Sequence, residues 1–214
     1  MTADAKTEIL ARIRGALADS PAVPKTPRAY RKTSELSRKE IVDMLEDRLV
    51  DYKANVFRET AETVAERIAT QLGASARYVI PAGFDTAFLP DDTAARRAIV
   101  DPNDGGKASA LGVRELNRVD AVVTSSTVSC AQTGTIFLSG REDEGRRAIT
   151  LVPDHHICIV PLDSIVELIP EALARVEPTA PTTMISGPSA TSDIELERVE
   201  GVHGPRTLDV ILLG

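Results

Sequence analysis

The segment from Gly187 to Glu195 combines residue types that bind anions in many proteins. Its turn-forming and polar members are Gly187, Pro188, Ser189, Thr191, Asp193 and Glu195. The Gly-Pro pair predicts a turn after a strand at residues 183–186, and Ser192 and Glu195 have capping-box spacing for a following helix. Because a helix N-terminus directs free N–H groups outward, we predict a site for a carboxylate or phosphate here. An ordinary capped turn is the alternative.

A second candidate is the sequence His203-Gly204-Pro205-Arg206. One small and one rigid residue separate an imidazole from a guanidinium and fix the backbone between them. The guanidinium of Arg206 is a natural bidentate partner for a carboxylate. We therefore predict that His203, Gly204 and Arg206 belong to the anion site. The alternatives are a surface ion pair for Arg206 and a structural hydrogen bond for His203.

A third candidate joins two expected strands and comprises Gln132, Thr133, Gly134 and Thr135. Gly134 permits a tight turn or the close approach of a ligand. The hydroxyls of Thr133 and Thr135 are suited to donate hydrogen bonds to an oxyanion. The alternative is a β-turn with buried threonines.

The histidines and cysteines do not form a metal-binding pattern. His155 and His156 are adjacent and point to opposite faces of a strand, so they cannot easily ligate one ion. Cys130 and Cys158 cannot hold an iron–sulfur cluster alone, because four thiolates are the usual requirement. Their apolar surroundings favour buried thiols over a disulfide. We expect no metal and no cofactor bound by this chain alone.

Lysine usage narrows the chemistry further, because no lysine follows Lys107. A Schiff base is therefore not expected at a C-terminal site. The sequence lacks a GxxxxGK[ST] phosphate-binding loop, and no GxGxxG follows an expected strand.

The composition predicts a cytoplasmic protein. The 214 residues include 3% aromatic residues and carry a net charge of -7, which argues against nucleic-acid binding. No signal segment opens the chain, and its longest uncharged run, residues 121–140, is too polar to span a membrane. A basic excess at residues 25–39 indicates a solvated linker, with a partner-docking strip as the alternative.

Two parts follow from the order of predicted elements. Residues 1–35 form an N-terminal helix, at residues 4–18, and a Pro-rich basic linker. Residues 36–214 form an α/β domain, because strand–helix–strand alternation favours a parallel sheet covered on both faces. Helices are predicted from Ser37, from Thr60, at residues 105–111 and at residues 164–176, the last with a kink or restart at Pro170. Strands are predicted at 55–58, 78–81, 98–101, 121–123, 135–138, 148–152, 156–160, 183–186 and 208–213, with antiparallel pairing among 135–138, 148–152 and 156–160.

The C-terminal motifs, in this order, resemble the lactate-utilization (LUD-domain) family. They are Thr133-Gly134-Thr135, Arg146-Arg147, Pro153-Asp154-His155-His156-Ile157, Gly187-Pro188-Ser189 with Asp193-Ile194-Glu195, and Gly201-Val202-His203-Gly204-Pro205-Arg206. The resemblance runs nearly end to end and is strongest from Ala121 to Leu213. It implies a three-layer α/β/α fold with a mainly parallel sheet, similar to ribose-5-phosphate isomerases and CoA transferases.

The resemblance also implies a function in the oxidation of L-lactate to pyruvate. This chain would be a non-redox subunit that binds a small carboxylate or anionic cofactor, and its partner subunits would carry the iron–sulfur clusters. Family members often have Glu before the Thr-Gly-Thr, whereas this chain has Gln132, which cannot act as a carboxylate base. The alternative is a stand-alone enzyme that acts on a phosphorylated or CoA-linked small molecule.

Overall fold

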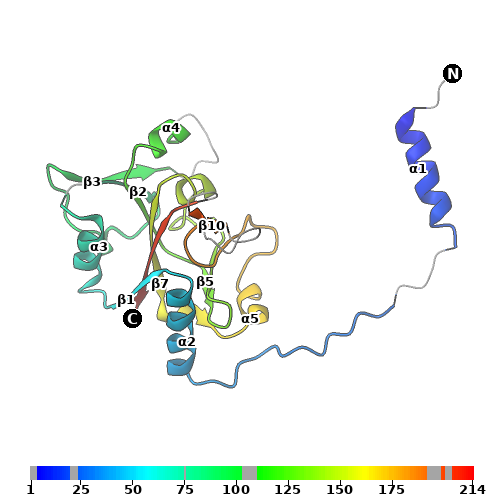
Figure 1. The fold of residues 1–214 in the computed structure, drawn as a ribbon, viewed down its shortest axis with the longest axis horizontal. Coiled ribbons are helices and arrows are strands. Elements are labelled where there is room, and N and C mark those ends of the chain that lie inside the picture. The colour runs from blue at the N-terminus through cyan, green and yellow to red at the C-terminus, as the bar shows by residue number, and fades with distance from the viewer. Residues whose placement is uncertain (1–3, 20–23, 75, 103–109, 192–198, 201–203) are drawn as a thin grey trace. The chain divides into compact units, whose positions relative to one another are not determined.

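The computed structural model describes the chain except residues 1–3, 20–23, 75, 103–109, 192–198 and 201–203 (Figure 1). The chain divides into two units, Met1–Arg31 and Lys32–Gly214. The first unit contains helix α1, Ala5–Ala16, which confirms the predicted N-terminal helix. Every residue of α1 is exposed. Within the described residues, no helix combines the length and apolar character needed to cross a membrane.

A six-stranded parallel sheet forms the centre of the second unit. In spatial order its strands are β1 (Asn55–Glu59), β12 (Thr207–Leu213), β7 (His155–Pro161), β4 (Ala121–Thr124), β2 (Ala76–Pro81) and β3 (Arg96–Asp101). Strand β4 is buried along its whole length between β7 and β2, as its continuous apolar sequence predicts. The parallel α/β class predicted from the sequence is therefore confirmed.

Helices cover both faces of this sheet and produce three layers (Figure 1). Helix α3, Val64–Leu72, packs its buried residues against Ile157 and Ile211 on one face. Helix α2, Arg38–Asp51, packs against Cys158 and Val210, which point to the opposite face because side chains alternate along a strand. The short helix α4, Val113–Leu116, covers the β2 and β4 part of this second face.

The start of α2 follows the predicted capping box. The Ser37 backbone N–H donates to the Glu40 carboxylate at 2.8 Å, and the Glu40 N–H donates to the Ser37 hydroxyl at 3.4 Å. The predicted stripe of Ile41, Leu45 and Leu49 is buried. This helix is thus fixed to the sheet, and its C-terminal end provides a surface on which other segments pack.

A second sheet lies in the same unit and has the order β8 (Ile165–Val166), β5 (Val128–Cys130), β6 (Thr135–Leu138) and β9 (Thr183–Ile185). Strand β6 is antiparallel to both β5 and β9. A separate antiparallel pair joins β10 (Ala190–Thr191) to β11 (Val199–Glu200). The predicted antiparallel pairing of residues 156–160 with residues 135–138 is wrong, because β7 joins the parallel sheet instead.

Two other predicted elements are wrong, and the reason is tertiary packing. Residues 147–150 form a 3-10 helix, η2 (Arg147–Thr150), which packs Ile149 in one cluster with Val79 and Val122. The predicted helix start at Ser164 is wrong, because η3 (Leu162–Ser164) and β8 occupy that segment. The restart expected at Pro170 is confirmed, since helix α5 (Ile169–Leu173) has Pro170 in its first turn. The Ser164 hydroxyl donates to the Pro161 carbonyl at 2.8 Å and so does not cap a helix.

The remaining short element is η1 (Thr86–Phe88). The predicted helix at 105–111 falls largely in residues that the structure does not describe, and the predicted helix start at Ser192 falls there entirely.

A loop from Gly140 to Arg146 covers the carboxyl ends of three strands of the parallel sheet. Its Glu142 carbonyl accepts a hydrogen bond from the Gly83 N–H after β2, at 3.0 Å, and its Asp143 carbonyl accepts one from the Ser125 N–H after β4, at 3.0 Å. Its Arg146 guanidinium donates to Asp101 at the end of β3, at 2.7 and 2.9 Å. Ligands of open α/β sheets ordinarily bind at this edge, and here the loop fills it over β2, β3 and β4.

Candidate functional site

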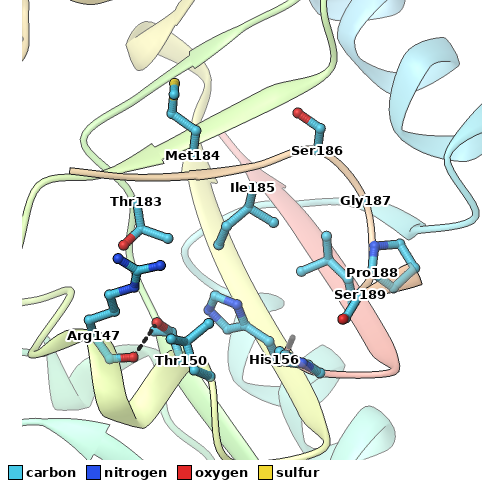
Figure 2. Close-up of a pocket in the computed structure, with 14 residues that line it drawn as sticks. Arg147, Thr150, His156, Thr183, Met184, Ile185, Ser186, Gly187, Pro188 and Ser189 are labelled. Atoms are coloured by element: carbon cyan, nitrogen blue, oxygen red, sulfur yellow. Dashed lines mark hydrogen bonds between the residues drawn. The ribbon is translucent and has the colours of Figure 1, made fainter. Parts of the chain in front are cut away.

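A cavity of about 290 Å³ lies between β9 and the amino ends of β7 and β12 (Figure 2). The residues that line it are Arg147, Thr150, Leu151, His156, Thr183, Met184, Ile185, Ser186, Gly187, Pro188, Ser189, Gly204, Pro205 and Leu208. Among them, Gly187, Pro188, Ser189 and Gly204 were predicted to bind a ligand. We call this cavity the first pocket. Its volume is at the small end of the range for ligand sites, which suits a small metabolite.

Strand β9 forms one wall of the first pocket, and its side chains alternate. Thr183 and Ile185 point into the pocket, whereas Met184 and Ser186 point away from it (Figure 2). The Ser186 hydroxyl lies 2.9 Å from that of Thr135. Strand β9 therefore offers one polar and one apolar side chain to the pocket and uses its other face to join β6.

The turn after β9 is shaped by its contact with α2. Gly187 has a φ of 83°, and a Cβ atom there would lie 2.7 Å from the Tyr52 Cβ and 2.9 Å from the Tyr52 carbonyl oxygen. Only glycine combines this backbone conformation with so close an approach. The Ser189 N–H then donates to the Pro205 carbonyl at 2.8 Å. The two segments that the sequence singled out therefore meet at the pocket, although they are separated in the chain.

His156 lies on the floor of the first pocket and is buried, with 1% of its surface exposed. Its Nε2 atom lies 2.8 Å from the Thr124 hydroxyl. Burial, and secondarily the nearby His155, lowers the pKa of His156 from 6.5 to about 3. The imidazole is consequently neutral at physiological pH. It can exchange hydrogen bonds with a ligand but does not supply a positive charge.

Arg147 supplies the positive charge of the first pocket. It is the one arginine or lysine among the described lining residues, and its side chain is exposed. In the described part of the chain, its guanidinium makes no hydrogen bond and no ion pair. The Thr150 hydroxyl donates to the backbone carbonyl of Arg147 at 3.1 Å and makes no hydrogen bond with the guanidinium. The neighbouring Arg146, by contrast, is committed to Asp101. An available guanidinium beside hydroxyl groups favours an anionic ligand.

Arg206 does not line the first pocket. Its Nε atom donates to both carboxylate oxygens of Asp154, at 2.7 and 2.8 Å, and 60% and 53% of the two side chains are exposed. The hydrogen bond from Arg206 lowers the pKa of Asp154. The structure thus shows the surface ion pair that was the alternative for Arg206. The guanidinium that faces the pocket is that of Arg147.

The Thr133-Gly134-Thr135 turn also lies outside the pocket lining. The Thr133 and Thr135 hydroxyls are 2.8 Å apart, and Thr135 continues to Ser186 on the side of β9 that faces away from the pocket. Gly134 has a φ of 60°, and a Cβ there would lie 2.9 Å from the Arg48 Cβ of α2. Gln132 is exposed. In this structure the turn supports β9 from behind and is the buried β-turn given as the alternative.

Four of the predicted residues cannot be placed in the site. Asp193, Glu195 and His203 lie outside the described residues. Thr191 belongs to β10, where its backbone pairs with Val199, and its side chain is not described. Their assignment to the site stays a prediction.

The adjacent histidines point to opposite faces, as expected. His155 lies 2.8 Å from the Asp209 carboxylate, away from His156 and its partner Thr124. Asp209 also accepts hydrogen bonds from Asn55 at 2.7 Å and Gln71 at 2.8 Å. No group of three potential metal ligands occurs among the residues described. Cys130 and Cys158 are free and buried, and burial raises the pKa of Cys158 to about 12.

Sequence reasoning did not assign Arg147, Thr150, His156 or Thr183 to the ligand site. A signal existed for two of them, since Arg146-Arg147 and His155-His156 belong to the ordered motifs. The sequence could not show which member of each pair faces the pocket, because that depends on partners distant in the chain.

These features define a class of α/β protein. Its members have a parallel core sheet and a ligand-sized pocket between that sheet and a second one. The LUD domain family model matches residues 32–213. The chain belongs to this family.

Similar proteins agree with this assignment. A Deinococcus radiodurans protein named Lactate utilization protein C is 43% identical over 217 residues, which cover 100% of this chain and 97% of that protein. A Bacillus subtilis protein of the same name is 33% identical over 109 residues, covering 47% of this chain and 45% of that protein. The crystal structure of a DUF162 family protein from Deinococcus radiodurans superposes with a TM-score of 0.69 and 37% identity, covering 84% of this chain and 99% of that one.

Proposed function

We propose that this chain takes part in lactate utilization as a non-redox subunit that binds a small 2-hydroxy or 2-oxo carboxylate in the first pocket. The observation that carries the proposal is the presence in one pocket of the Arg147 guanidinium, which no described residue neutralises, and the neutral, buried His156. The name of the relatives, Lactate utilization protein C, supports the metabolic assignment.

The pocket has a suitable group for each part of such a ligand. The guanidinium of Arg147 is matched to the carboxylate. The neutral imidazole of His156 can accept a hydrogen bond from a 2-hydroxyl or donate one to a 2-oxo group, depending on its tautomer. Ile185 and Leu208 supply apolar surface in the same pocket.

Oxidation of lactate to pyruvate removes two electrons and two protons, and this proposal assigns the electron acceptor to partner subunits. The chain's own Cys130 and Cys158 are buried and too few to ligate an iron–sulfur cluster. The raised pKa of Cys158 also keeps its thiol protonated and a poor ligand. Iron–sulfur clusters would therefore be carried by the partners, and this subunit would hold or position the carboxylate.

Anaerobic co-purification tests the complex. A tagged full-length chain should retain proteins with iron–sulfur absorbance, and lactate oxidation by the extract should fall when this chain is removed. If the chain purifies alone and lactate oxidation continues unchanged without it, the subunit assignment is wrong.

A thermal-shift panel of L-lactate, pyruvate, a sugar phosphate and CoA tests the ligand class separately. Lactate or pyruvate should stabilise the protein, by about 2.7 kcal/mol at a hundredfold excess over Kd. Stabilisation by only CoA or the sugar phosphate would favour a stand-alone enzyme, because a guanidinium also suits a phosphate.

A further inference from the structure

A second cavity of about 290 Å³ adjoins the first pocket. Arg147, Thr150 and Thr183 line both, so the two spaces share a wall. The rest of the second cavity is formed by the end of β6, the loop that covers the carboxyl edge of the sheet, and Pro181 before β9. We call it the second cavity. Arg147 therefore lies between the first pocket and the second cavity and lines both.

The other charged groups of the second cavity are already paired. The buried Glu144 carboxylate accepts hydrogen bonds from the Thr127 hydroxyl and from the backbone N–H groups of Ser139, at 2.6 Å, and Arg141, at 3.1 Å. Arg146 is held by Asp101. Both groups therefore already have hydrogen-bond partners within the protein.

Apart from the buried Ser139 hydroxyl, which pairs with no described residue, the remaining walls of the second cavity have little polarity. They include Leu138, Pro181 and two glycines, Gly140 and Gly145. A space with such walls, bordered by Arg147, is suited to the uncharged arm of an acid whose carboxylate is bound at Arg147.

We infer that the ligand of this site extends past Arg147 into the second cavity and is a 2-hydroxy or 2-oxo acid with an apolar side chain longer than the methyl group of lactate. This inference rests on the proposed carboxylate-binding function and specifies its ligand class. Each methylene that enters an apolar space strengthens binding by about fourfold. An acid with a branched four-carbon side chain is therefore expected to bind more tightly than lactate by about tenfold or more.

Gly140 offers a way to fill the second cavity alone. It has a φ of 71°, a conformation that asparagine tolerates better than other residues with side chains. A Cβ there would have its nearest neighbours, the carbonyl oxygens of Gly145 and Pro181, at 4.0 Å. Those two residues line the second cavity, and none of the three lines the first pocket. Gly140→Asn should thus narrow one compartment and leave the other unchanged.

The experiment is calorimetric titration of the full-length chain with L-lactate, 2-hydroxyisocaproate and 3-phenyllactate. The wild type should bind the two longer acids about tenfold more tightly than lactate. Gly140→Asn should remove most of that advantage and leave lactate binding unchanged. Pro181→Phe, at an exposed position on the same cavity, provides a second variant if the first does not fold.

The outcomes separate this inference from the proposed function. If lactate binds and the longer acids bind no more tightly, the extended site is wrong and the carboxylate site stands. Equal weakening of lactate and the longer acids by Gly140→Asn also overturns the extended site. If no acid of any length binds to the wild type, both proposals fail.

Discussion

The Nε2 atom of His156 and the hydroxyl of Thr124 lie 2.8 Å apart on adjacent parallel strands, directly under the first pocket. The bond holds the imidazole of His156, which is directed toward the first pocket (Figure 2). A buried hydrogen-bonded histidine on a regular strand is held rigidly, as a ligand-orienting group should be.

The first prediction concerns the pH dependence of stability. The pKa of His156 is lowered to about 3, so between pH 6.5 and 3 the unfolded chain binds a proton that the folded chain does not. Stability from this group is therefore complete above pH 6.5 and is lost as the pH falls, by about 1.4 kcal/mol per unit. Urea unfolding of wild type and His156→Asn at pH 7 and pH 5 should show the difference between them shrinking by about 2 kcal/mol at the lower pH. Parallel loss in both proteins would contradict the prediction.

The second prediction compares two arginines. Arg147→Gln should weaken binding of the carboxylate ligand by about 10- to 100-fold, because it removes a charge-assisted hydrogen-bonding group from the pocket. Arg206→Gln is the matched control and should change the affinity by less than about twofold, because Arg206 pairs with the exposed Asp154. Calorimetric titration distinguishes the two. A larger effect at Arg206 would support the site predicted from the sequence and contradict the role given to Arg147.

The third prediction compares two glycines with positive φ. Gly187→Ala should destabilise the fold by about 2–4 kcal/mol, because the new methyl group adds a clash with Tyr52 to the backbone strain. Gly73 has a similar φ of 73°, but a Cβ added there would meet no atom within 4 Å, so Gly73→Ala should cost only the backbone strain, about 1–3 kcal/mol, and less than Gly187→Ala. Equal losses in urea unfolding would show that the Tyr52 contact is unimportant.

The fourth prediction concerns the buried carboxylate of Asp209. Burial alone would raise its pKa, but hydrogen bonds from His155 and Asn55 outweigh that effect and lower it. Asp209→Asn should cost about 2–4 kcal/mol at pH 7, because the new amide cannot accept all three hydrogen bonds. The penalty should shrink as the pH falls below about 4, because the carboxylate then takes up a proton in the unfolded wild-type chain, whereas in the folded protein it stays ionised down to its lowered pKa. Asp154→Asn, at an exposed ion pair, should cost less than about 1 kcal/mol at pH 7. Similar losses for both variants would argue against the buried network.

The fifth prediction concerns the N-terminal unit. The buried core clusters begin at Ile41, and α1 contributes no buried residue. Deleting residues 1–31 should therefore leave the melting temperature of Lys32–Gly214 within about 2 °C of the full-length value. A large decrease would mean that the first unit packs on the second. Loss of partner binding without loss of stability would assign the unit to docking.

Elements with local signals could be predicted from the sequence. The Ser37 capping box and the apolar run at Ala121–Val123 specify their structures through neighbours a few residues away. The strand predicted at 148–152 failed because Ile149 is buried by residues distant in the chain. The helix predicted from Ser164 failed because a competing hydrogen bond to Pro161 was available.

Local turn signals also pointed to part of the lining of the first pocket. Turn chemistry identified Gly187-Pro188-Ser189 and Gly204, which the fold brings to one pocket. The sequence could not show whether Arg147 or Arg206 faces the pocket. In the structure Arg206 donates to the carboxylate of Asp154, and Arg147 lines the pocket. No local pattern carries that information, since an ion pair forms between side chains that only the folded chain brings together.

The segment that leads from Gly140 to Arg147 has a double role in the molecule. It covers the carboxyl edge of the parallel sheet, and it ends at the cation of the first pocket. Insertions or deletions in this segment would therefore alter both the cover of the carboxyl edge and the pocket at the amino ends of β7 and β12. Among relatives of this chain, ligand preference should accordingly vary with the length of this loop more than with substitutions in the strands. The loop is therefore the first segment to change in a redesign of ligand specificity.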